Sequence, residues 1–339
     1  MRGGEFFGAG VGSRKESAST NRCLVALFLL LVLPSVAWPP EDGPSQGDQG
    51  TIRVNVDLVV LHATVRNHEG ILVSGLGQED FQVFEDGVPQ EIKIFSHEDT
   101  PVTVGLVVDS SGSMKSKRAK VIAAALAFAR SSHPEDQMFV VSFNENVYFG
   151  LPDNTPFTDK EDQLQVALSR IKADGMTALY DATAAALAHL KKGKQDKKVL
   201  IVISDGADNA SQHTVAQIMT MAGQSDAIIY PLGVFEQDDP DRNPGVLRRL
   251  ARATGGEAFF PRSVDHVVPI CEQIARDIRN QYTIAYVPTN RKQDGTYRVV
   301  RLQAGAAGHG RLVVRTRAGY YALVKPQPLP AANPPGGSE

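Results

Sequence analysis

The middle of the sequence alternates apolar runs of strand length with stretches of helical periodicity, and no other feature limits the fold as strongly. Residues 102–108 read Val-Thr-Val-Gly-Leu-Val-Val, which is typical of a strand buried on both faces. Further strands are expected near 138–143, 199–203 and 228–234, with helices near 121–128, 164–171, 179–190, 214–222, 245–253 and 265–280. Because helical crossovers join parallel strands, the pattern predicts a doubly wound, Rossmann-like α/β domain with a mainly parallel sheet over residues 100–281.

Short alternating segments flank this domain on both sides. Residues 51–98 place Ile52, Val54, Val56, Leu58 and Val60 at a period of two, and residues 282–324 repeat the pattern at Tyr282, Ile284 and Tyr286. A small isolated sheet hides little apolar surface. We therefore expect both segments to form one small antiparallel β-sandwich that carries the α/β domain as an insertion, with two separate β pieces as the alternative. The sandwich core is expected to include Phe81, Phe84 and Phe95.

The first 37 residues have the pattern of an export signal. Positive charges at Arg14, Lys15 and Arg22 precede an apolar run from Leu24 to Leu33, and Ser35-Val36-Ala37 offers small residues for cleavage. Because a membrane span needs about 20 apolar residues and this run stops at Pro34, we predict a cleaved signal peptide and a secreted, periplasmic or cell-envelope protein. An uncleaved anchor is the alternative. Residues 38–50 and 325–339 are rich in Pro and Gly, and are predicted to be a linker and a disordered tail.

Charge and cysteine content exclude several classes of protein. A formal net charge of -3 provides no excess of Lys and Arg for nucleic acid or an anionic membrane. After cleavage only Cys271 remains, so stability has to come from packing and bound metal rather than from an intrachain disulfide. Cys271 falls on a helical apolar stripe with Val267, Ile274 and Ile278, which predicts a buried structural thiol.

Three polar loops follow or precede the predicted elements of the α/β domain at one edge. The sequence Asp109-Ser110-Ser111-Gly112-Ser113 ends the first strand, Asp174-Gly175-Met176-Thr177 precedes a helix, and Ser204-Asp205-Gly206 follows the strand that ends at Ile203. Doubly wound folds bind ligands at the carboxyl ends of their strands. The side chains expected to converge there are Asp109, Ser111, Ser113, Thr177 and Asp205.

Three hydroxyls and two carboxylates form an all-oxygen donor set. Such a set suits Mg²⁺ or Mn²⁺, and Ca²⁺ less well, rather than zinc. Two carboxylates leave the ion short of charge and ligands, so a water or a partner's carboxylate would complete it. Taken singly, the loop at Asp109 is equally typical of a helix N-cap and Asp205-Gly206 of an ordinary turn, but caps do not require a third loop to supply Thr177.

These five residues resemble the metal-ion-dependent adhesion site of von Willebrand factor type A (VWA) domains, over residues 102–281. The resemblance implies that Ser111, Ser113 and Thr177 contact the ion directly, while Asp109 and Asp205 act directly or through water. In some family members the last helix moves on ligand binding, and here residues 265–280 lead straight into the second β segment. The mature chain is also similar to the VWA-related proteins of acidobacteria, which implies little about function.

We therefore predict a non-enzymatic secreted or cell-envelope binding protein that captures an acidic residue of a protein ligand through the cation. The eight His residues show no paired ligand spacing, and no nucleophile elbow or Walker A loop occurs. The alternatives are a structural envelope protein in which the metal only stabilises the fold, a metal-dependent hydrolase with Asp109 or Asp205 as base, and an AAA+ complex subunit. The export signal disfavours the last of these.

Several polar residues near the motif are predicted to be solvated turn and loop residues rather than ligands. They are Asp174, Asp208, Asn209 and the basic run from Lys191 to Lys198, which follows a helix C-terminus where cations interact favourably with the exposed carbonyls.

Overall fold

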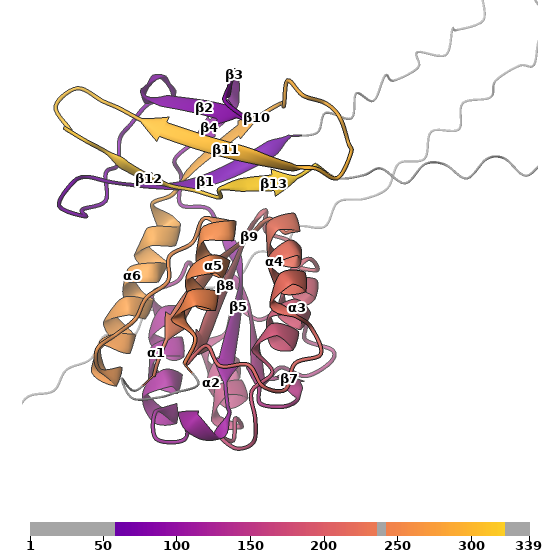
Figure 1. Ribbon diagram of the computed structural model, residues 1–339. Coiled ribbons are helices and arrows are strands. Elements are labelled where there is room, and N and C mark those ends of the chain that lie inside the picture. Colours follow the sequence, from indigo (N-terminus) through magenta and orange to yellow (C-terminus); the bar gives the residue numbers. More distant parts are fainter. Residues whose placement is uncertain (1–57, 236–241, 323–339) are drawn as a thin grey trace, which may run out of the picture. The chain divides into compact units, whose positions relative to one another are not determined.

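The structure is a computed structural model that describes residues 58–235 and 242–322. The predicted signal peptide, the linker, the C-terminal tail and Ile52, Val54 and Val56 lie outside the described residues. The described residues form an α/β domain and a β-sandwich (Figure 1).

The α/β domain is built on a five-stranded sheet in the order β7-β6-β5-β8-β9. Its strands are β5 (Val102–Asp109), β6 (Gln137–Phe143), β7 (Val147–Phe149), β8 (Lys197–Ser204) and β9 (Ala227–Gly233). All neighbours are parallel except β7, which pairs antiparallel with β6. Every residue of β5 and β9 is buried, because helices cover both faces of a parallel sheet.

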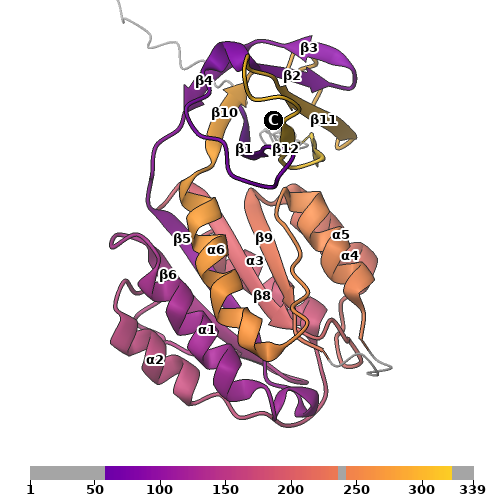
Figure 2. The same ribbon diagram turned by 90° about the vertical axis from the view of Figure 1, so that its left-hand side faces the viewer.

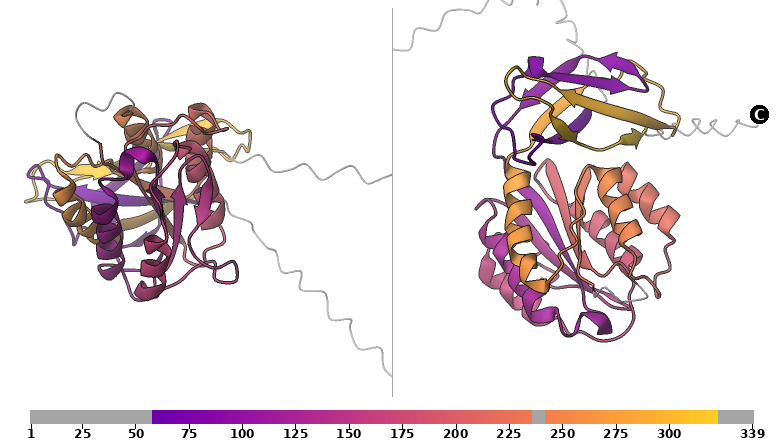
Figure 3. Two further views of the ribbon diagram at one scale, coloured as in Figure 1. Left: turned by 90° about the horizontal axis from the view of Figure 1, so that it is seen from below. Right: turned by 60° about the vertical axis from the view of Figure 1, so that its left-hand side comes forward.

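Six α-helices complete the described part of this domain, with α1 and α6 on one side of the sheet and α3 and α4 on the other (Figures 1 and 3). They are α1 (Arg118–Arg130), α2 (Glu161–Ser169), α3 (Leu179–Leu190), α4 (Val215–Gln224), α5 (Pro244–Thr254) and α6 (Val267–Arg279). Two of these helices begin with a side-chain cap: Thr214 and Gln217 form a capping box before α4, and Asn243 caps α5 ahead of Pro244.

The β-sandwich contains two four-stranded sheets, in the orders β12-β1-β10-β4 and β13-β11-β2-β3 (Figure 2). The strands before the α/β domain are β1 (Val59–Arg66), β2 (Phe81–Glu85), β3 (Val88–Gln90) and β4 (Ile92–Ser96). Those after it are β10 (Tyr282–Tyr286), β11 (Tyr297–Ala304), β12 (Val313–Arg315) and β13 (Gly319–Tyr321). Each sheet mixes strands from both groups, so the predicted fold class, an α/β domain inserted in an antiparallel sandwich, is confirmed and the alternative of two β pieces is wrong.

The sandwich core combines apolar side chains with one buried ion pair. Leu61, Tyr282 and Ile284 are fully buried, while the Glu85 carboxylate lies 3.3 Å from the Arg298 guanidinium and both side chains are almost inaccessible to solvent. The hydroxyls of Tyr286 and Tyr320 each donate to Glu85 Oε2 at 2.8 Å. A buried charge needs such partners, and this network had no counterpart in the sequence analysis.

Two predictions about individual side chains are wrong. Phe84 does not join the core: β2 alternates, so Phe81 and Val83 face inward and Phe84 faces outward, half-buried. Lys197 is not part of a solvated loop. It begins β8, is 3% exposed, and donates from Nζ to the Ile278 carbonyl at the end of α6 at 2.8 Å.

The predicted burial of Cys271 is confirmed. Its side chain is fully buried on the inner face of α6, with Val267, Ile274 and Ile278. Burial raises the pKa of the Cys271 thiol to about 12. The side chain therefore packs as a small apolar group and stays unreactive at neutral pH.

Candidate metal centre

Asp109, the last residue of β5, is 3% exposed and anchors the first loop of the site. Its Oδ1 accepts hydrogen bonds from the Ser111 amide at 2.9 Å and from the Ser111 hydroxyl at 2.6 Å. Its Oδ2 accepts from the Ser204 hydroxyl at 2.6 Å. Both oxygens are therefore held in place by hydroxyls from two loops, and Ser204 is a site residue that the sequence analysis missed.

The oxygen cluster continues from the first loop to the loop after β8. The Ser111 and Ser113 hydroxyl oxygens are 3.2 Å apart, and the Ser113 hydroxyl donates to Asp205 Oδ2 at 2.6 Å. Asp205 is 1% exposed, and its Oδ1 accepts from the Ala207 amide at 3.1 Å. Four of the five predicted residues thus form one continuous chain of oxygen contacts.

Thr177 lies on the third loop, which backbone hydrogen bonds join to the other two. The Gly112 amide donates to the Gly175 carbonyl at 3.1 Å, and the amides of Asn209 and Ala210 donate to the Thr177 carbonyl at 3.0 Å. Gly175 has φ +79°, which favours glycine in this turn. Thr177 is 4% exposed, and its hydroxyl lies outside the chain of contacts that joins Asp109, Ser111, Ser113 and Asp205.

The carboxylates of Asp109 and Asp205 lie close enough to repel each other when both are charged. Burial, and then the nearby Asp205 carboxylate, raise the pKa of Asp109 to about 6, against hydrogen bonds from Ser111 and Ser204 that lower it. Within residues 58–235 and 242–322, no Lys, Arg or His forms a salt bridge with either aspartate. Two buried carboxylates without a cationic side chain form a site that a bound cation would stabilise.

The residues present therefore fit a hard divalent cation. Carboxylate and hydroxyl oxygens are its preferred ligands, and Asp109, Ser111, Ser113 and Asp205 bring them together. Ser113 is exposed while the other three are buried, so the cluster opens to solvent on the Ser113 side. No group of three or more His, Cys, Asp and Glu that could hold a metal occurs in the described part of the chain, so the cluster offers few protein charges to an ion.

Asn209 is exposed in a bend, as predicted, whereas Asp208 is half-buried, and both also position the Thr177 loop. Asn209 Oδ1 accepts from the Thr177 amide at 2.8 Å. Asp208 Oδ2 accepts from the Tyr180 amide at 2.9 Å, at the start of α3, and from the Ser211 hydroxyl at 2.6 Å. A sequence can suggest that a short polar side chain binds an amide within a few residues of it. The amides that Asp208 and Asn209 bind here lie about thirty residues away, so the sequence did not indicate these contacts.

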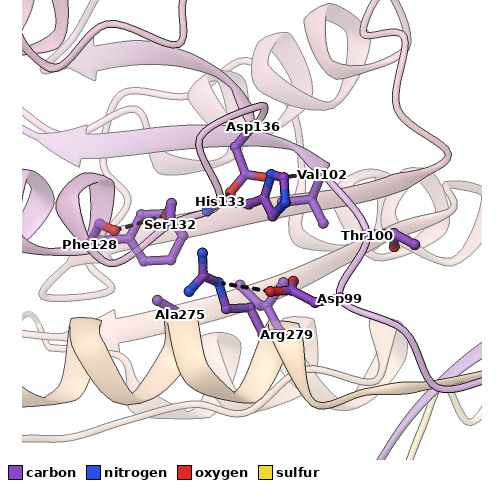
Figure 4. A pocket seen from close by; sticks show the side chains of 10 residues that line it. Asp99, Thr100, Val102, Phe128, Ser132, His133, Asp136, Ala275 and Arg279 are labelled. Atoms are coloured by element: carbon purple, nitrogen blue, oxygen red, sulfur yellow. Dashed lines mark hydrogen bonds and ion pairs between the residues drawn. The ribbon is translucent and has the colours of Figure 1, made fainter.

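A second polar pocket lies at the opposite end of β5, where the chain enters the α/β domain (Figure 4). The Asp136 carboxylate there accepts from the amides of Val102 at 2.7 Å and His133 at 2.9 Å. Arg279 Nε lies 3.6 Å from Asp99 Oδ2 across the pocket. Burial raises the pKa of Asp136. Because backbone amides bind both carboxylate oxygens of Asp136, this side chain has a structural role: it holds the start of β5 against the turn before β6.

The α/β domain has a central, mainly parallel sheet, and aspartate and serine oxygens cluster at the carboxyl ends of β5 and β8. These features define the doubly wound class of domains, which bind ligands at this edge of the sheet. Residues 104–207 match the family model of the von Willebrand factor type A domain. The chain therefore contains a VWA domain, and the matched range includes all five predicted site residues.

Solved structures give distant likenesses. The chain is similar to a von Willebrand factor type A protein from Catenulispora acidiphila, at 15% identity over 80% of this chain and 75% of that one, with a TM-score of 0.46. It is also similar to the vWF domain of the type V pili tip protein Mfa5 from Porphyromonas gingivalis, at 14% identity over 53% and 95%, with a TM-score of 0.44. No curated protein matches. Likenesses of this strength carry no argument about function.

Proposed function

We propose that this protein is an exported binding protein whose VWA domain holds a divalent cation and uses it to capture an acidic side chain of a protein partner. One observation carries the proposal: Asp109 and Asp205 are buried close together, bridged by Ser111 and Ser113, and no cationic side chain of the described residues pairs with either. VWA domains are mostly protein-interaction modules rather than enzymes, which favours binding over catalysis.

The resident ion would be Mg²⁺ or Mn²⁺, held by Asp109, Ser111, Ser113, Thr177 and Asp205. Ser111 and Ser113 donate their hydroxyl protons to the two carboxylates, which leaves the lone pairs of both hydroxyl oxygens available to a cation. When bound, it would supply a Lewis-acidic position for a partner's carboxylate. The exposed Ser113 side is where a partner would approach.

Export rests on the N-terminal sequence, whose basic residues, short apolar run and small residues fit a signal peptide. None of the helices in the described part of the chain has the length and apolar content that crossing a bilayer requires.

Metal binding and partner capture test the proposal in two stages. Titration with Mn²⁺, followed by calorimetry, is expected to show one site in the wild type and none in Asp205→Ala. Capture of partners from envelope and secreted extracts, with Mg²⁺ or with EDTA, is then compared for the wild type and Asp109→Ala. Asp159→Ala is the matched control, because Asp159 is an exposed carboxylate before α2.

Capture that survives both EDTA and Asp109→Ala would exclude the adhesion mechanism. If the wild type binds Mn²⁺ but retains the same partners without it, the metal only stabilises the fold and the structural alternative holds.

A further inference from the structure

The loop that carries Thr177 depends on neighbouring loops for its shape. The Asp174 amide donates to the Ser110 carbonyl at 2.8 Å, and the Ala178 amide to the Asn144 carbonyl at 2.7 Å. Between them, the Met176 amide donates to Glu145 Oε2 at 3.0 Å. The backbone on both sides of Thr177 is therefore held by partners outside the loop's own sequence.

Glu145 reaches this loop from the turn between β6 and β7. The turn is closed by hydrogen bonds from the Asn144 amide to the Asn146 carbonyl at 3.0 Å and from the Asn146 amide to Asn144 Oδ1 at 2.9 Å. Glu145 is exposed, but its carboxylate lies so close over Gly175 that a Cβ at position 175 would collide with it. An exposed glutamate has many solvated rotamers, and here it adopts one that reaches a backbone amide.

We propose that Glu145 is a positioning residue of the metal centre. By binding the amide of Met176, its carboxylate fixes the Gly175–Met176 peptide, one residue before Thr177, and so helps to hold the Thr177 hydroxyl where a cation would bind. The inference rests on the proposed function for its consequence, whereas the hydrogen bond between Met176 and Glu145 stands without it. Groups that hold a ligand in place contribute strongly to metal affinity, because the protein then loses less freedom on binding.

A different role would be purely electrostatic. Glu145 would add a third negative charge near Asp109 and Asp205 and attract the cation without ordering the loop. Glutamine separates the two roles, because its side-chain oxygen still accepts from the Met176 amide while its charge is zero. Alanine removes both the acceptor and the charge.

The experiment compares Glu145→Ala, Glu145→Gln and the control Glu135→Ala by two measurements. Glu135 is also an exposed glutamate, at the opposite end of β6, so its removal changes the net charge equally. We expect Mn²⁺ affinity to fall about tenfold in Glu145→Ala, and to stay within about threefold of wild type in Glu145→Gln and Glu135→Ala. In the metal-free protein, amide exchange at Met176 is expected to accelerate in Glu145→Ala alone.

Equal loss of affinity in Glu145→Gln and Glu145→Ala would overturn the positioning role in favour of charge. Unchanged exchange at Met176 in Glu145→Ala would overturn it as well. A wild type that binds no Mn²⁺ would contradict the proposed function, while the exchange measurement would still decide whether Glu145 orders the loop.

Discussion

At the scale of single residues, Asp109 is expected to make the stability of the protein without bound metal depend on pH. Burial and the Asp205 carboxylate raise its pKa to about 6, against an unfolded value near 3.9. Between these values the folded state holds a proton that the unfolded state has released, so stability is greatest below the unfolded pKa and falls as pH rises through 6. The shift corresponds to a loss of about 3 kcal/mol.

Asp109→Asn is expected to remove this pH dependence, because the amide resembles the protonated acid. Urea unfolding in EDTA at pH 4, 5, 6 and 7 should show the wild type losing stability relative to Asp109→Asn as pH rises. Added Mg²⁺ should restore the wild type at pH 7 and leave the variant unchanged. Parallel pH profiles for the two proteins in EDTA would show that Asp109 ionises normally in the folded state.

The five candidate ligands could be named from the sequence because position and residue type agree: each lies near the end of a predicted strand or the start of a predicted helix, and each carries an oxygen that suits a hard cation. Glu145, Ser204 and Asn209 could not be predicted in this way. Their roles depend on single contacts with loops distant in the sequence, and alone each reads as an ordinary polar residue near a turn.

At the scale of elements, buried strands could be predicted from the sequence and short edge strands could not. The prediction of β5, β8 and β9 succeeded because a strand covered on both faces must be apolar throughout. The three-residue edge strands β3 and β7 were missed: Val88-Pro89-Gln90 and Val147-Tyr148-Phe149 are too short to show a period. Edge strands face fewer neighbours, so packing restricts their sequences less.

Lys197 joins two elements and gives a second pH prediction. Burial lowers the pKa of its amine to about 8, where Nζ donates to the Ile278 carbonyl of α6. Because the folded pKa lies below the unfolded value near 10.4, the unfolded state holds the extra proton between them, and stability rises with pH through this range.

Relative to Lys197→Met, the wild type should therefore gain up to about 3 kcal/mol as pH rises from 8 to 10.5. Denaturant unfolding of both proteins at half-unit intervals measures the difference and cancels the titration of shared tyrosines. A constant difference across this range would mean that Lys197 keeps its ordinary pKa in the folded protein.

At the scale of the whole molecule, charged side chains bind the sandwich to the α/β domain. Arg66 of β1 lies 2.5 Å from Asp277 of α6, Arg315 pairs with Glu257, and Arg317 donates to the Gly223 carbonyl at the end of α4 at 2.8 Å. Gln281 adds a buried hydrogen bond to the Tyr230 hydroxyl at 3.0 Å. These contacts have specific geometry, and separating the two parts would leave buried polar groups without their partners, so we expect the two parts to unfold together.

The Arg66–Asp277 pair tests this coupling. The Asp277 side chain is 1% exposed, so Arg66→Met would leave a buried carboxylate without its partner, at a cost of about 3 to 5 kcal/mol. Arg66→Met with Asp277→Leu should recover much of that loss, because no charge then remains buried. Arg130→Met is the matched control: it removes an Arg that pairs with Glu161 on the surface, where ion pairs contribute little.

Calorimetry of the wild type should show a single transition that moves to lower temperature in Arg66→Met and is unchanged in Arg130→Met. Two separate transitions in the wild type would show that the sandwich and the α/β domain unfold independently, and an Arg66→Met protein as stable as the control would show that the pair does not couple them.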